Sequence, residues 1–131
     1  MIESLSEATK RWLESFGWPV VDVDGNLDGR LNHGQVEIQA TLTPEMRALV
    51  LLHEGAHILF QHDLPTRRYD PSARSRNEVS AENAAVMCAR LLGVDLSAAS
   101  APYLARFSGT LTDQRTGYVA REMAAHIRAW V

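Results

Sequence analysis

Two histidines and a glutamate stand close together in one apolar stretch of the chain, residues 49–60. The stretch contains His53, Glu54 and His57 in the order His-Glu-x-x-His. Because residues four apart lie on the same face of a helix, His53 and His57 can direct two imidazoles at one point. Glu54 follows the first histidine, where a carboxylate can take a proton from a metal-bound water. The spacing therefore predicts a Zn2+ site with Glu54 as the catalytic residue.

A catalytic zinc needs three protein ligands and one open position, so the sequence must supply a third ligand. Asp63 lies six residues after His57. Zincins with a longer form of this motif place their third ligand at that spacing. However, those proteins have a glycine where this chain has Phe60, and the glycine lets the chain leave the helix and turn back. Asp63 is therefore a candidate ligand, but Phe60 makes the turn that it would need harder to form.

Two glutamates on the next predicted helix are the other candidates. Glu78 lies 78 − 57 = 21 residues beyond His57, a gap similar to that of zincins whose third ligand is a glutamate. Glu82, one turn later, is then placed to accept a hydrogen bond from His53, as ligating histidines usually require. If Glu82 were the ligand, the residue one turn later would be Val86, which cannot accept one. We expect Glu78 as the ligand and Glu82 as its supporting residue or the alternative ligand.

The helix that carries the motif is expected at about 44–61. Thr43, Pro44 and Glu45 suit the N-cap, the first helical position and the first turn of a helix. The motif contains Gly55, and glycine inside a helix costs up to about 1 kcal/mol relative to alanine. We therefore expect another part of the chain to pack closely at Gly55.

The other elements are expected to form helices packed on a small, mainly antiparallel sheet, an α+β fold. Alternating apolar and polar residues predict a strand at 36–42, preceded by a hairpin turn at 32–35 that contains a solvated His33. Weaker strands are expected at 20–23 and 27–31, and helices at 5–16, 78–92 and 113–130. A short apolar segment is expected at 103–107, and a polar loop at 66–77 that holds Arg67, Arg68, Arg74 and Arg76.

Length and composition predict one domain over residues 1–131. Of the 131 residues, 46% are hydrophobic, which is enough for an ordinary core. The formal net charge of -3 gives no reason to expect a nucleic acid or an anionic membrane as a partner. Cys88 is the one cysteine, so no intramolecular disulfide can form. Without a leader-like N-terminus or a long uncharged run, the sequence indicates a soluble, cytoplasmic protein.

Two segments, 51–60 and 78–85, together resemble the ImmA/IrrE-like metallopeptidases. They look closest to the branch related to the protease-like domain of ArdC-type antirestriction proteins. In that branch the second motif is followed by Leu-Gly-Val/Ile-Asp, a serine-rich piece and Tyr-Leu. The matching segments here are 92–95, 97–100 and 103–104, and the resemblance covers roughly 36–107.

The resemblance implies a zincin-like fold, zinc held by His53, His57 and a glutamate, and Glu54 as the catalytic base. It also implies a protein or peptide substrate, since family members are linked to the cleavage of repressor-type regulators in phage, mobile-element and stress circuits. Some relatives carry a helix-turn-helix segment that this sequence lacks, so direct DNA binding is not expected. The first hypothesis is therefore a zinc metallopeptidase. The alternative is a non-enzymatic interaction protein, such as an antirestriction or immunity factor, that uses the zinc fold as a scaffold.

A peptidase also needs a group that stabilises the oxyanion. The sequence does not single one out, and the candidates are Tyr69, Tyr103, Tyr118 and the arginines of the 66–77 loop.

Overall fold

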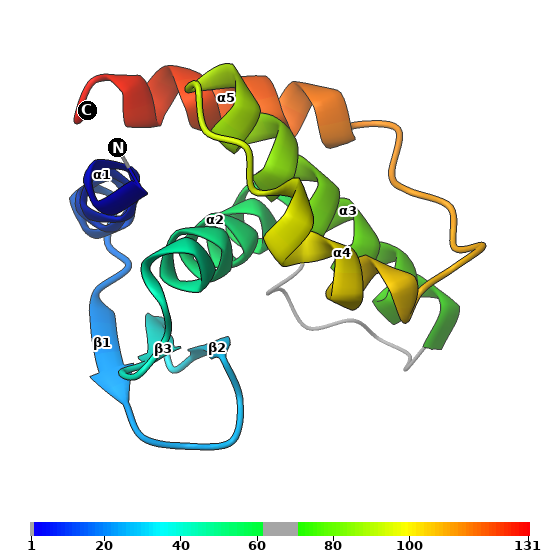
Figure 1. Cartoon of the computed structure of the whole chain (residues 1–131), viewed down its shortest axis with the longest axis horizontal. Helices are drawn as coiled ribbons and strands as arrows, with labels where there is room; N and C mark the ends of the chain where they lie inside the picture. The colour runs from blue at the N-terminus through cyan, green and yellow to red at the C-terminus, as the bar shows by residue number, and fades with distance from the viewer. Residues whose placement is uncertain (1, 62–70) are drawn as a thin grey trace.

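The structure is a computed structural model that describes residues 2–61 and 71–131. Within these residues the chain forms five helices packed on a small three-stranded sheet, which confirms the expected α+β class. The elements in chain order are α1 (Ile2–Ser15), β1 (Val20–Val23), β2 (Gly29–Asn32), β3 (Gln35–Gln39), α2 (Pro44–Phe60), α3 (Pro71–Leu91), α4 (Ser97–Ala105) and α5 (Thr116–Arg128). In Figure 1, α2 lies in the middle, with α1 and the strands on one side, α3 and α4 on the other, and α5 across the top.

Helix α2 is the centre of the core. It contacts the other four helices and strands β2 and β3, and every residue from 48 to 57 is buried. A helix that is apolar on almost all sides is expected to be surrounded in this way. Thr43 caps its start by accepting a hydrogen bond from the Met46 backbone N–H at 3.3 Å, and Pro44 is the first residue. The predicted boundaries, 44–61, are confirmed to within one residue.

Helix α1 approaches α2 closely at Gly55, as the glycine in the motif predicts. A Cβ atom added to Gly55 would lie 2.7 Å from Cζ3 of Trp12, which is closer than real Cβ atoms come to a neighbour. Trp12 and Leu13 are both buried at this contact. Glycine is thus required here because the indole of Trp12 fills the space that a side chain would need.

The sheet is mixed, so the expectation of a mainly antiparallel sheet is wrong. Its strand order is β1-β3-β2, with β2 antiparallel to β3 and β1 parallel to β3. The predicted hairpin turn between β2 and β3 is confirmed, because exposed His33 and Gly34 both have positive φ, as a tight hairpin requires. Residues 24–28 connect β1 to β2 at the opposite edge of the sheet. The hairpin then places β3 between these two strands, antiparallel to β2 and parallel to β1.

Helix α3 begins at Pro71, seven residues before the predicted start at 78. Proline suits the first position of a helix, and Pro71 occupies that position here. Ala73, Arg74 and Arg76 are good helix formers, so the polar segment extends the helix. The predicted loop is therefore wrong for 71–77, and its remaining residues, 66–70, lie outside the described part. Glu78 thus stands in the interior of the helix and not at its start.

The C-terminal part contains two helices. Helix α4 begins at Ser97, although the sequence predicted only a short apolar segment after Pro102, and Pro102 lies inside this helix. The Asp95 carboxylate accepts a hydrogen bond from the Ser97 backbone N–H at 2.9 Å, which favours the earlier start. Helix α5 spans 116–128 within the predicted 113–130. Among the described helices, none combines the length and apolarity needed to cross a bilayer.

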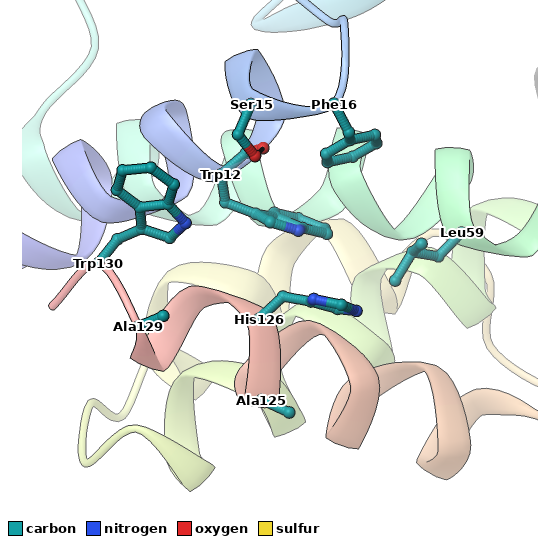
Figure 2. A pocket seen from close by; sticks show the side chains of 8 residues that line it. All are labelled: Trp12, Ser15, Phe16, Leu59, Ala125, His126, Ala129 and Trp130. Atoms are coloured by element: carbon teal, nitrogen blue, oxygen red, sulfur yellow. Dashed lines mark hydrogen bonds between the residues drawn. The ribbon is translucent and has the colours of Figure 1, made fainter.

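A cleft of about 420 Å³ lies between the C-terminal ends of α1, α2 and α5 (Figure 2). The rings of Trp12 and His126 are stacked across it, with centroids 6.3 Å apart and planes within 14°. The cleft is lined by Trp12, Ser15, Phe16, Leu59, Ala125, His126, Ala129 and Trp130. Among the described residues that line the cleft, His126 is the one titratable side chain, so these residues supply no group of ionisable side chains.

The contact between Gly55 and Trp12 predicts that Gly55→Ala destabilises the protein. Overpacking of a core costs about 1–3 kcal/mol, which outweighs the gain of up to about 1 kcal/mol from alanine's helix propensity. Denaturant unfolding should show a lower free energy of unfolding for Gly55→Ala. The control is Gly25→Ala, since a Cβ atom there meets no atom within 4 Å. Equal stability of Gly55→Ala and the wild type would contradict the packing account.

Candidate metal centre

The two histidines of the motif meet on the face of α2 that looks toward α3. The Nε2 atoms of His53 and His57 lie 2.9 Å apart, and the two rings are nearly perpendicular, at 76°. Both side chains are buried, with about 8% of each residue exposed. The helical spacing of four residues therefore does what the sequence predicts and directs two imidazole nitrogens at one point.

Helix α3 brings the carboxylate of Glu78 to the same point. Its Oε2 lies 3.2 Å from Nε2 of His53, and its Oε1 lies 3.1 Å from Nε2 of His57. Ligand atoms bound tetrahedrally at about 2.0–2.1 Å from a metal lie about 3.3 Å from one another. The observed separations of 2.9–3.2 Å are close to this value. His53, His57 and Glu78 thus form a group that could hold a metal ion.

Glu82 occupies the other side of the His53 ring. Its Oε1 lies 2.8 Å from Nδ1 of His53, while Glu78 is close to Nε2. An imidazole that ligates a metal through one nitrogen usually hydrogen-bonds a carboxylate through the other. The arrangement therefore gives Glu82 the position predicted for a supporting residue. Asp63, the third candidate ligand, lies outside the described residues.

Helix α4 adds two hydroxyl groups to the site. Ser100 Oγ donates a hydrogen bond to Glu82 Oε2 at 2.7 Å, and the Tyr103 hydroxyl donates one to Glu78 Oε2. The Tyr103 ring also meets the His53 ring edge to face, with centroids 5.5 Å apart. The sequence named Tyr103 only as an oxyanion candidate and gave Ser100 no role. The signal that was available is that Ser100 is a polar residue in a small-residue stretch and lies one turn before a tyrosine.

The remaining oxyanion candidates do not join this group within the described residues. Tyr118 is 58% exposed on α5, and Arg74 and Arg76 are exposed on the first turns of α3. Tyr69, Arg67 and Arg68 lie outside the described part of the chain.

Glu54 is buried next to the metal-binding group, with 7% of the residue exposed. A Cβ atom added to Gly29 would lie 3.8 Å from Cγ of Glu54, so strand β2 passes directly over this part of α2. Burial raises the pKa of Glu54, although the nearby charges of His53 and His57 act in the opposite direction. A carboxyl group whose pKa is raised in this way is suited to accept a proton and to return it.

The carboxylates determine how His53 is charged. Burial alone lowers the pKa of His53, but hydrogen bonds to Glu78 and Glu82 outweigh it and raise the pKa to about 10. The pKa of Glu78 is well below its usual range because, despite burial, its hydrogen bonds to His53 and His57 favour the carboxylate. In the metal-free protein at neutral pH, His53 is therefore protonated and Glu78 is ionised.

Substitutions of the two glutamates should separate their roles. Glu78→Ala removes a ligand, so stoichiometric zinc binding should be lost. Glu82→Gln keeps the ligands and removes the carboxylate that supports His53, so zinc affinity should fall by about 10–100-fold. Competition with a chromogenic chelator measures both effects, and Glu122→Gln on α5 is the control. Loss of binding in Glu82→Gln, with binding retained in Glu78→Ala, would exchange the two assignments.

Metal binding should release a proton from His53. A metal at Nε2 must displace the proton that a pKa of about 10 keeps on the ring at neutral pH. Zinc affinity should therefore rise with pH across the neutral range. Calorimetry at pH 8 in buffers of different ionisation enthalpy should give at least one proton released per zinc ion, one from His53 and a further one from a water that zinc ionises. Binding without proton release would show that His53 is neutral in the metal-free protein.

Comparisons of the chain with protein-family models, with curated proteins and with solved structures found no match.

Proposed function

We propose that the chain is a zinc-dependent metallopeptidase with a zincin-like fold, related to the ImmA/IrrE-like family. The observation that carries this proposal is the grouping of His53, His57 and Glu78, with Glu54 buried beside them. Within the described residues the group offers three ligands, and a catalytic zinc takes three protein ligands and one further position. A purely structural metal has no use for a glutamate in the position of Glu54.

Zinc is the metal that best suits these side chains. Imidazole nitrogen and carboxylate oxygen are both common zinc ligands, and two imidazoles are not expected around Mg2+ or Ca2+, which prefer oxygen. The close spacing of the three side chains also fits a four-coordinate ion better than one that needs six or more oxygens. When bound, zinc polarises a carbonyl group and lowers the pKa of water to about 7. In this assignment His53, His57 and Glu78 hold the ion.

Glu54 is proposed as the general base and acid of peptide hydrolysis. Its carboxylate takes a proton from the attacking water and delivers it to the nitrogen of the leaving amine. Its burial supports this role, because the raised pKa makes the protonated form accessible between the two steps. Glu54 thus starts and ends the reaction as a carboxylate.

The position of β2 supports a peptide as the substrate. In the sheet order β1-β3-β2, β2 is an edge strand, and it lies over α2 at Glu54. An extended peptide can pair with such an edge through its backbone, which would place a peptide bond next to the site. From the family resemblance, we propose a repressor-type regulator as the physiological substrate. A cytoplasmic location is consistent with Cys88, which is free and buried.

The peptidase assignment predicts that Glu54→Gln strongly slows turnover and keeps the metal. Loss of a general base costs about 10²–10⁴-fold in rate, while the three ligands are unchanged. Cleavage of a peptide library by zinc-loaded protein, read by mass spectrometry, measures the rate, and metal analysis measures the zinc content. Glu45→Gln, an exposed glutamate on the same helix, is the control.

Two other outcomes decide against parts of this proposal. If zinc-loaded Glu54→Gln cleaves as fast as the wild type, Glu54 is not the base. If the wild type binds zinc and cleaves no peptide, the non-enzymatic interaction protein becomes the better account of the site.

A further inference from the structure

Helix α4 contacts the metal-binding group through two side-chain hydroxyl groups. Ser100 is the one residue of α4 that is fully buried, and its Oγ donates to Glu82 Oε2 at 2.7 Å. Tyr103 is partly buried and donates its hydroxyl to Glu78 Oε2. The most buried contact of α4 is therefore a hydrogen bond, from Ser100 to Glu82, and not an apolar contact.

In both helices the two contacting residues lie one helical turn apart. Ser100 and Tyr103 are three residues apart on α4, and the glutamates that they contact, Glu82 and Glu78, are four residues apart on α3. Side chains at either spacing lie on one face of a helix, one turn apart. The helices thus meet along one turn each, with each hydroxyl placed against its own carboxylate.

Both carboxylates also contact the same imidazole. Glu82 uses Oε1 for Nδ1 of His53 and Oε2 for Ser100. Glu78 uses Oε2 for both Nε2 of His53 and the Tyr103 hydroxyl. A glutamate side chain has several rotatable bonds, and a hydrogen bond at its far end restricts the directions that its oxygens can take. Helix α4 therefore fixes the two groups that surround His53.

We propose that Ser100 and Tyr103 are positioning residues that set the metal affinity of the site. Ser100 acts through Glu82, which orients the His53 ring and keeps Nε2 directed at the metal position. Tyr103 acts through Glu78, whose carboxylate it holds toward the two Nε2 atoms. This inference rests on the proposed metal site and is independent of whether the protein is a peptidase.

The first test is the zinc affinity of Ser100→Ala and Tyr103→Phe, each of which removes only a hydroxyl group. Hydrogen-bond partners of ligands and of their supporting groups typically contribute 10–100-fold to affinity. We expect about tenfold weaker zinc binding in each variant by chelator competition. Ser97→Ala is the control on α4, since its hydroxyl contacts Asp95. Tyr118→Phe on α5 is the control for the tyrosine, because Tyr118 is exposed.

A double-mutant cycle separates positioning from a general structural role. If Ser100 acts through Glu82, the Ser100→Ala substitution should have no further effect on zinc affinity in a Glu82→Ala background. Unfolding of the metal-free variants in denaturant is measured alongside. Lower stability with unchanged zinc affinity, or additive effects in the cycle, would overturn the proposed role of Ser100.

The same experiments distinguish this inference from the metal site itself. Zinc bound equally well by the wild type, Ser100→Ala and Tyr103→Phe would overturn the positioning role and keep the site. Absence of zinc binding by the wild type would overturn the metal site and this inference with it.

Discussion

The constraint on which the structure depends is the burial of several ionisable side chains between α2 and α3. His53, His57 and Glu82 are each less than a tenth exposed. An isolated buried charge is strongly unfavourable, so such groups must be paired or bind a metal. Here each contacts another member of the group, with Glu78 joining the two rings. The fold accordingly serves to hold two helices at the distance at which these contacts form.

Local sequence patterns predicted the parts of the structure that short-range physics determines. The helix that carries the motif, its Thr43 cap and the hairpin turn at His33 and Gly34 follow from residue types at fixed offsets. The requirement for close packing at Gly55 was also predictable, but its partner was not. Trp12 lies 43 residues earlier in the chain (55 − 12 = 43), and no local pattern connects the two.

The errors arise where tertiary contacts decide between alternatives that the sequence leaves open. Pro71 is compatible with a turn or with the first turn of a helix, and the structure has the helix. The parallel pairing of β1 with β3 depends on the path of residues 24–28, which carries no periodic signal. Likewise, whether Glu78 or Glu82 is the third ligand depends on how α3 is rotated relative to the rings of His53 and His57. The role of Ser100 depends on α4, a helix that the sequence did not predict in full.

The most direct test of the central claim is the position of zinc in a crystal of the zinc-loaded protein, located by anomalous scattering at the zinc edge. We expect a single strong peak about 2.0–2.2 Å from Nε2 of His53, Nε2 of His57 and a carboxylate oxygen of Glu78, with Glu82 on the Nδ1 side of His53. A peak at another group of residues, or a zinc ion held by Glu82 in place of Glu78, would contradict the account.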